Sequence, residues 1–167
     1  DYMLPRAYRR PRGLTGATRE GMDLQKAKKD LSDLLAGKRI LKPVYDHASG
    51  KVLPEAEVIP KDIIIVTGNA TYYPELDASY DIGYFIGVSK TDEEQTVQWR
   101  ARRSFEKRGY PTMNAALKWE RIVLADYHRF VEPGASVADL LYEITGKYKL
   151  ILKEKSARAE QLLNMKR

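Results

Sequence analysis

The sequence predicts an α/β domain in which strands and helices alternate along the chain. Two short runs of apolar residues, 63–66 and 84–88, are rich in β-branched or aromatic side chains and are typical of strands buried on both faces of a parallel sheet. Charged or amphipathic segments with helix-capping residues surround these runs. This alternation favours a sheet with right-handed crossover connections. Ligands in such sheets bind beyond the carboxyl ends of the strands.

The N-terminal third is expected to contain one helix between two irregular segments. Residues 1–21 are punctuated by prolines and glycines and are predicted to be irregular. A helix is predicted from Asp23, a good N-cap residue, because apolar residues then recur at helical spacing until Gly37 ends the pattern. Residues 38–61 contain three prolines and are expected to form a long loop, which in a compact domain is usually functional or mobile.

The C-terminal half is predicted to hold two helices, two strands and a closing helix. Thr91 and Glu94 have the spacing of a capping box, which opens a charged helix ending near Gly109. A further helix is predicted over 112–127. Segments 140–144 and 148–152 flank Thr145-Gly146-Lys147, a hairpin or tight connection. We divide the chain into one domain, 1–153, and a basic C-terminal helix, 154–167.

Composition narrows the classes of function. The chain has 167 residues, 43% of them hydrophobic, and no cysteine, which excludes disulfides, thiolate zinc sites and a cysteine nucleophile. A formal charge of +6 suits anionic partners such as phosphorylated metabolites, nucleic acid or acidic protein surfaces. No apolar run approaches the roughly 20 residues that span a membrane. The arginine-rich start lacks the apolar core of a signal peptide. We therefore expect a soluble compartment, cytoplasmic or stroma-like, and either a processed start at Asp1 or a longer parent chain.

Five segments in order resemble the phosphoribulokinase/uridine kinase family, over about residues 1–145. The resemblance implies a P-loop NTPase-like α/β fold, a three-layer sheet with flanking helices that here is incomplete at the N-terminus. It also implies transfer of the γ-phosphoryl group of ATP to a sugar hydroxyl, with Mg²⁺ as the metal. The segments are Leu14-Thr15-Gly16 with Met22-Asp23-Leu24, 42–50 (KPVYDHASG), 62–73, Arg102-Arg103 with Arg108-Gly109, and Phe130-Val131-Glu132-Pro133.

The resemblance assigns roles to individual positions. Tyr45, His47, Arg103 and Arg108 match the side that binds the sugar, and arginine suits bidentate binding of a sugar phosphate. Asp1 aligns with one of the family acids that end the preceding strand and is a candidate base. Two other family acids are absent, because their positions hold Thr67 and Ser104, and the family histidine near the start is Leu4. A hydroxyl cannot supply the anionic oxygen that Mg²⁺ prefers.

The phosphate-binding glycine loop is also absent from the sequence. A P-loop needs G-x-x-x-x-G-K-[ST], yet none of Gly37, Gly50 and Gly146, which precede lysines, has a glycine five positions earlier. The first hypothesis is therefore a non-catalytic binding, structural or regulatory subunit that needs neither ATP nor Mg²⁺ and contacts a protein partner or a second copy, with a sugar phosphate as a further ligand. Segments 72–84 and 153–167 are the candidate contacts.

Two alternatives stay open. The chain is the C-terminal part of an active kinase that uses ATP and Mg²⁺ on ribulose 5-phosphate or uridine, or it is a basic nucleic-acid-binding module. A basic cluster could bind nucleic acid, but no helix-turn-helix, zinc-finger or RNP pattern accompanies it, which disfavours nucleic acid as the partner. These residues also have a structural interpretation without a ligand. His47 can be a surface or turn histidine, His128 a structural one, and Arg103 and Arg108 part of a solvated helix face. The cluster comprises Arg100, Arg102, Arg103, Lys107, Arg108 and Tyr110.

Overall fold

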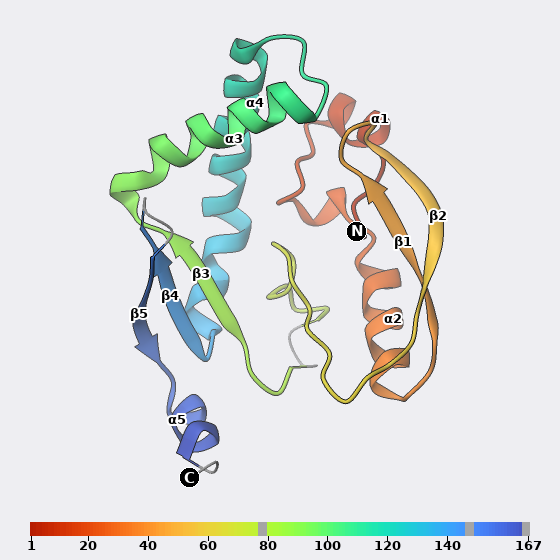
Figure 1. Ribbon diagram of the computed structural model, residues 1–167, viewed down its shortest axis with the longest axis vertical. Helices are drawn as coiled ribbons and strands as arrows, with labels where there is room; N and C mark the ends of the chain where they lie inside the picture. The colour runs from red at the N-terminus through yellow and green to blue at the C-terminus, as the bar shows by residue number, and fades with distance from the viewer. Residues whose placement is uncertain (77–79, 146–148, 165–167) are drawn as a thin grey trace.

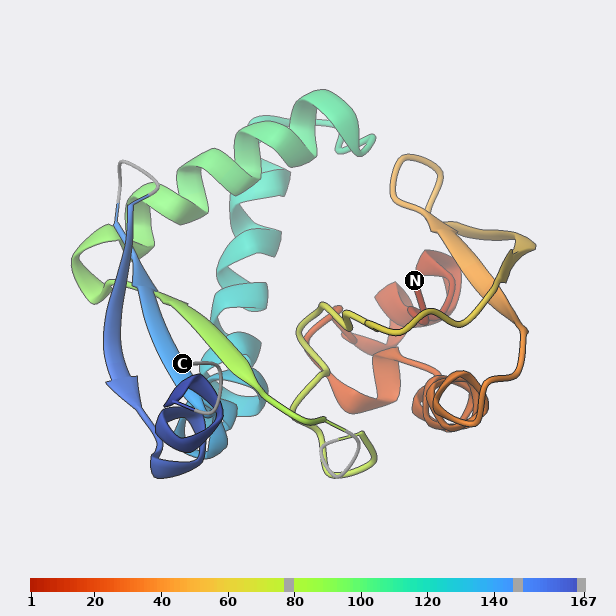
Figure 2. The same ribbon diagram turned by 60° about the horizontal axis from the view of Figure 1, so that its bottom comes forward.

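The computed structural model describes all residues except 77–79, 146–148 and 165–167. Figures 1 and 2 show two halves. One half holds helices α1 and α2 with a β-hairpin, and the other holds the sheet β3-β4-β5 with helices α3 and α4. The predicted α/β class is confirmed. Within the described residues, no helix has both the length and the apolar character needed to cross a bilayer.

The N-terminal segment is more regular than the sequence predicted. Residues 1–21 contain α1 (Arg6–Arg9) and the 3₁₀ turns η1 (Arg10–Arg12) and η2 (Arg19–Gly21), so the prediction of irregular chain is wrong. Pro5 is the N-cap of α1 and Pro11 lies in the first turn of η1, where the missing N–H is not needed. The helix predicted from Asp23 is confirmed as α2 (Leu24–Leu35), with the Asp23 carboxylate accepting from the Lys26 amide at 2.9 Å.

The predicted loop over 38–61 is instead an antiparallel hairpin, and that prediction is wrong. Strand β1 (Ile40–Asp46) pairs with β2 (Lys51–Val58), with a register shift between Lys42 and Val44. Prolines misled the prediction, because each strand of a two-stranded ribbon keeps one free edge where a residue without an N–H is tolerated. Gly50 ends the turn at φ 73°, a left-handed conformation that favours glycine.

The predicted strand at 63–66 is also wrong. This segment is extended but pairs with no strand of the described part of the chain, and Ile63 and Ile65 are 79% and 81% exposed. A buried parallel strand needs hydrogen-bonded neighbours on its edges. The chain then turns inward, where Ala70 and Tyr73 pack with Leu24 of α2.

The sheet has the order β3-β4-β5. Strand β3 (Tyr84–Val88) pairs parallel with β4 (Leu140–Ile144), as alternating strands and helices predicted, and β4 pairs antiparallel with β5 (Leu150–Lys155). The predicted turn between β4 and β5 falls partly on residues outside the described ranges. Helix α5 (Ala157–Asn164) follows, within the predicted closing helix. The division between residues 153 and 154 stays a prediction.

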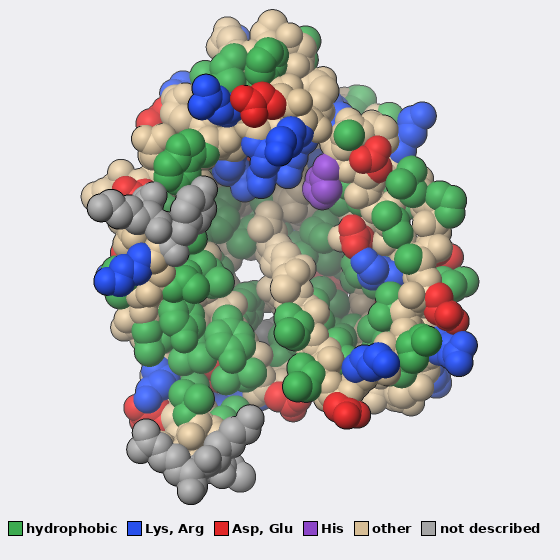
Figure 3. Space-filling model, viewed as in Figure 1, with side chains coloured by type: hydrophobic (Ala, Val, Ile, Leu, Met, Phe, Trp, Pro, Cys, Tyr) green, Lys and Arg blue, Asp and Glu red, His purple; other side chains and the backbone are tan. Residues whose placement is uncertain are grey.

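The two faces of the sheet differ, so the prediction that the strand at 84–88 is buried on both faces is wrong, because Tyr84 and Ile86 are exposed. On one face Phe85 packs against Ala17 and against Val131, which belongs to a π-helical turn, η5 (Tyr127–Val131), followed by η6 (Glu132–Val137). The other face carries apolar side chains with no covering helix among the described residues, and Figure 3 shows them gathered over β3, β4 and β5. We call this surface the open sheet face. It comprises Tyr84, Ile86, Val88, Tyr142, Ile144, Leu150 and Leu152.

Helices α3 (Glu93–Lys107) and α4 (Met113–Asp126) pack against each other. In Figure 1, α3 lies above the sheet, whereas α4 runs down behind the strands. The predicted capping box at the start of α3 does not form. The turn η4 (Lys90–Asp92) precedes the helix, and the Thr91 hydroxyl bonds the Ser89 hydroxyl instead. The end near Gly109 is confirmed, as is the next helix, whose N-cap Thr112 accepts from the Ala115 amide at 3.1 Å.

Candidate functional site

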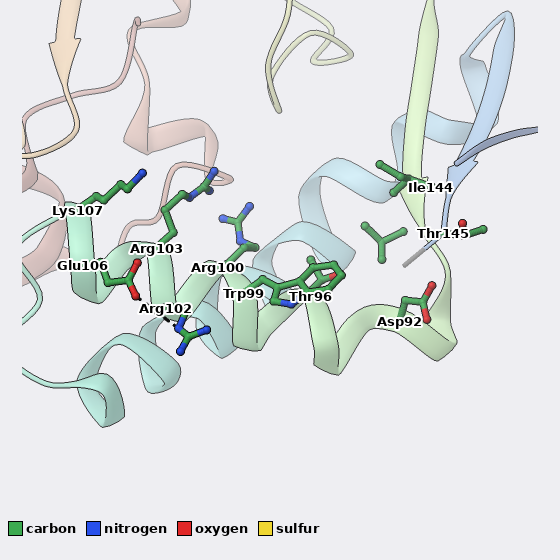
Figure 4. Close-up of a pocket in the computed structure, with 11 residues that line it drawn as sticks. Asp92, Thr96, Trp99, Arg100, Arg102, Arg103, Glu106, Lys107, Ile144 and Thr145 are labelled. Carbon is green, nitrogen blue, oxygen red and sulfur yellow. Dashed lines mark ion pairs between the residues drawn. The ribbon is translucent and has the colours of Figure 1, made fainter. Parts of the chain in front are cut away.

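Two cavities meet at helix α3. The first, about 490 Å³, lies at the carboxyl ends of β3 and β4, where an α/β sheet is expected to bind ligands. Figure 4 shows Arg100, Arg103 and Lys107 on one side of α3, whereas Arg102 points to the other side and pairs with Glu106. The lining residues are Val88, Asp92, Thr96, Trp99, Arg100, Arg102, Arg103, Glu106, Lys107, Ile144 and Thr145.

The second cavity, about 220 Å³, is strongly cationic. It lies between the N-terminal segment, the turn of the hairpin and helices α3 and α4. Six arginines line it, and the only carboxylate among its lining residues is that of Glu120. The lining residues are Met3, Arg6, Arg9, Arg10, Gly16, Tyr45, His47, Asn69, Arg100, Arg103, Arg108, Tyr110, Trp119, Glu120 and Val123. All four residues predicted to bind substrate are therefore brought together here, although their roles stay predictions.

Arg103 and Arg108 are available to a ligand. In the described part of the chain, neither guanidinium has a hydrogen-bond or ion-pair partner. Burial and the neighbouring Arg103 charge lower the pKa of Arg108 below its usual range, so the two cations repel each other across the cavity. An anion between them would relieve this repulsion, and arginine binds phosphate through two parallel hydrogen bonds.

Tyr45 and His47 are held at the hairpin end of the same cavity. Tyr45 is buried, its hydroxyl accepts a hydrogen bond from Arg9 at 2.8 Å, and its ring meets that of His47 edge to face at 5.1 Å. Burial, and then the charges of Arg108 and the other nearby cations, lower the pKa of His47 below its ordinary value. His47 is thus neutral near pH 7 and can accept or donate a hydrogen bond to a ligand.

Arg6 and Arg9 serve mainly to hold the cavity together. Arg6 donates to the carbonyls of His47 at 2.6 Å, Ala48 at 3.2 Å and Arg108 at 3.2 Å, and so ties the hairpin turn to the end of α3. Arg9 is buried, and besides Tyr45 it donates to the Leu4 carbonyl at 2.8 Å. Because their donors are already engaged, we do not count these two among the groups free to bind an anion.

Ser104 lies beside a carboxylate from the neighbouring helix. It is buried, and its hydroxyl donates to Glu120 Oε1 at 2.7 Å. The other oxygen of Glu120 accepts from Arg100 Nε at 2.8 Å. This bond uses the inner nitrogen of Arg100, which leaves the terminal fork of that guanidinium for a ligand. Sequence reasoning missed Glu120, whose only signal was a carboxylate four residues after the buried Ala116 on an otherwise apolar stripe.

The other predicted acid positions lie outside both cavities. Asp1 pairs with Lys42, and Thr67 is exposed in the extended segment before Gly68. Among the described residues no three His, Cys, Asp or Glu side chains are grouped as a metal site. His128 bonds Glu132 at 2.8 Å and lies 3.4 Å from Glu93, a structural contact between η5, η6 and α3.

Comparison with known proteins identifies a matching family and several similar kinases. The family model described as "Phosphoribulokinase / Uridine kinase family" matches residues 2–150. The chain is 25% identical over 148 residues to a phosphoribulokinase of Synechocystis, and 33% identical over 115 residues to a uridine kinase of Ligilactobacillus salivarius. It is 24% identical over 148 residues to the chloroplastic phosphoribulokinase of Triticum aestivum. These alignments cover 86%, 68% and 86% of the chain.

The chain spans about half or less of the length of these relatives, namely 43%, 53% and 35% respectively.

Proposed function

The chain belongs to the phosphoribulokinase/uridine kinase family, and from this membership we propose that it forms the acceptor-binding part of an ATP-dependent kinase whose acceptor is a sugar phosphate. The observation that carries the proposal is that Arg100 and Arg103 line both cavities. A phosphoryl group in transfer lies between donor and acceptor, and cations placed there stabilise the charge on its oxygens. A phosphoryl donor in the first cavity and an acceptor in the second would place the transferred group beside Arg100 and Arg103.

The cationic cavity supports a phosphorylated acceptor. Arg103 and Arg108 have free donors, and neutral His47 adds a group suited to a sugar hydroxyl. A sugar phosphate gains charge-assisted hydrogen bonds here, whereas a neutral nucleoside leaves several cations uncompensated. The proposal assigns Arg103 and Arg108 to the phosphate, and Tyr45 and His47 to the position of the sugar. ATP would supply the phosphoryl group.

The open sheet face supports a further layer of polypeptide on this chain. Parallel strands are normally covered on both faces, yet Tyr84 and Ile86 are 53% and 54% exposed. Ile63, Ile65 and Val66 are exposed as well. A layer contributed by more of the kinase, by a second copy or by a protein partner would cover them. Light scattering of the purified chain tests the second copy, because a monomer at high concentration excludes it.

A binding experiment tests the acceptor assignment. The affinity of the chain for ribulose 5-phosphate and for uridine is measured by titration calorimetry, and its unfolding temperature is measured with and without each ligand. Binding of the sugar phosphate should raise the unfolding temperature, and Arg103→Ala or Arg108→Ala should remove the effect. Arg102→Ala is the matched control, since Arg102 lies on the same helix, does not line the second cavity and pairs with exposed Glu106. A parent chain that binds uridine and no sugar phosphate contradicts the proposal.

A non-catalytic subunit is the second candidate function. Two hydroxyls, Thr67 and Ser104, stand where the family resemblance places acids, and Ser104 is buried against Glu120. The complete gene product, incubated with ATP, Mg²⁺ and ribulose 5-phosphate, separates the two candidates. Formation of ADP that depends on the sugar phosphate supports the kinase, whereas tight binding of the sugar phosphate with no ADP formed supports the non-catalytic subunit.

A further inference from the structure

Arg10 is held in the cationic cavity by two aromatic rings. Its guanidinium carbon lies 4.6 Å from the ring centroid of Tyr110 and 5.6 Å from that of Trp119. The three residues come from different elements, since Arg10 belongs to η1, Tyr110 follows α3 and Trp119 lies in α4. All three line the second cavity. The contacts place a cation from the N-terminal segment against the helical half of the molecule.

The way Arg10 is held leaves its hydrogen-bond donors open. A cation–π contact uses the positive charge of a guanidinium and takes up none of its N–H groups in a bond to an oxygen or nitrogen acceptor. Among the described residues, no acceptor is bonded to the Arg10 side chain, in contrast to Arg6 and Arg9 in the same cavity. Arg10 is therefore a fixed cation with free donors, which is a favourable arrangement for binding an anionic oxygen.

The same contacts close the aromatic surface to other ligands. Tyr110 and Trp119 offer the π-faces on which a flat, neutral base would stack. Arg10 already lies over both rings, so a nucleoside base would have to displace it and leave a cation without its aromatic contacts. A sugar phosphate needs no such displacement, because its phosphate would bind the edges of the guanidinium.

We propose that Arg10 is a specificity-determining residue, which selects an acceptor carrying a phosphate and disfavours a neutral nucleoside. The inference rests on the proposed function and adds to it a third arginine beside Arg103 and Arg108. Tyr110 and Trp119 are positioning residues that act through Arg10. The cavity thus distinguishes the two acceptor types that the names of the relatives suggest.

The test compares binding of ribose 5-phosphate, ribose and uridine to the parent chain and to variants. In Arg10→Ala the affinity for ribose 5-phosphate should fall about 10- to 100-fold, the loss typical of a charge-assisted hydrogen bond, and the preference for ribose 5-phosphate over ribose should fall with it. Arg10→Lys keeps the charge without the flat fork and should recover only part of the affinity. Arg10 is exposed, so neither change removes a core side chain.

Arg12→Ala is the matched control. Arg12 makes a cation–π contact of the same kind, 4.1 Å from the ring centroid of Tyr8, but does not line the cavity. Its removal should leave ribose 5-phosphate binding unchanged. Trp119 supplies a second readout: in a Trp99→Phe background, which leaves Trp119 as the single tryptophan, ribose 5-phosphate should change the emission of the parent and not that of Arg10→Ala.

The outcomes separate this inference from the proposed function. A parent chain that binds neither ribose 5-phosphate nor ribulose 5-phosphate refutes both. A parent that binds it while Arg10→Ala binds equally well refutes the role of Arg10 and leaves the proposed function intact. Equal losses in Arg10→Ala and Arg12→Ala would trace the effect to overall charge and also refute the inference.

Discussion

Replacing Glu120 by leucine should destabilise the fold, because it removes the shared partner of two donors. Leucine keeps most of the side-chain volume, so the loss is mainly polar. The Ser104 hydroxyl is buried and would lose its acceptor, which costs about 1–3 kcal/mol. The Arg100 side chain is 39% exposed, so solvent screens its ion pair and its loss adds no more than about 1 kcal/mol. We expect a total of roughly 1–4 kcal/mol.

Thermal unfolding followed by circular dichroism measures this loss. For a domain of this size 1 kcal/mol corresponds to about 2–4 °C, so the midpoint of Glu120→Leu should fall by roughly 2–16 °C. The control is Glu106→Leu, which removes a half-exposed carboxylate from its pair with Arg102 and should change stability by less than about 0.5 kcal/mol.

A double-mutant cycle sharpens the argument. Ser104→Ala alone removes one donor from a buried carboxylate, whereas the variant with both substitutions leaves no buried hydroxyl or carboxylate unpaired and exposes only Arg100, which solvent reaches, to the loss of its partner. The losses of unfolding free energy in the two single variants should therefore add up to more than the loss in the double variant. For residues in direct contact we expect a difference of about 0.5–3 kcal/mol. Equal midpoints for Glu120→Leu and Glu106→Leu, or strict additivity in the cycle, would refute the view that Glu120 joins Ser104 and Arg100.

The remaining predictions concern the hairpin turn and the two histidines. Gly50→Ala should destabilise the chain by more than about 1 kcal/mol in chemical denaturation, since φ is 73° and a Cβ would lie 2.6 Å from Arg6 side-chain atoms. The lowered pKa of His47 means that the unfolded chain binds more protons below pH 6.5, so stability should fall as pH falls below that value, and His47→Gln should remove this slope in a pH series of unfolding curves. The pKa of His128 is raised by its hydrogen bond to Glu132, so its stabilisation should be complete below pH 6.5 and be lost as pH rises through the raised pKa, a loss absent in His128→Gln.

Local sequence patterns correctly predicted the helices and strands that depend mainly on short-range contacts. Helix α2 begins after its N-cap Asp23 and α4 after Thr112, because these caps satisfy amide groups within one turn of the chain. Strands β3 and β4 were predicted from apolar runs alone, and their parallel pairing follows from the helices between them. Motif order also indicated the family and grouped Tyr45, His47, Arg103 and Arg108 as one substrate site, which the fold brings to one cavity.

The errors fall where distant contacts decide the local conformation. Prolines suggested a loop at 38–61, but the free edges of a two-stranded ribbon accept prolines. The run at 63–66 has the side chains typical of a buried strand, yet no strand in the described part of the chain pairs with it. No local signal could have shown that Arg100 would pair with Glu120, 20 residues away on the next helix.

The sequence by itself determined which residues carry charge, where helices α2, α3 and α4 and strands β3 and β4 lie, and to which family the chain is similar, because these properties depend on residue type and short-range spacing. Only the tertiary structure decided what each arginine does. Arg6 and Arg9 are bonded to backbone and tyrosine oxygens, Arg10 lies on two aromatic rings, and Arg103 and Arg108 face the cavity with free donors. The physical reason is that an arginine side chain has the same charge everywhere, and its function depends on the acceptors and rings that folding brings within reach.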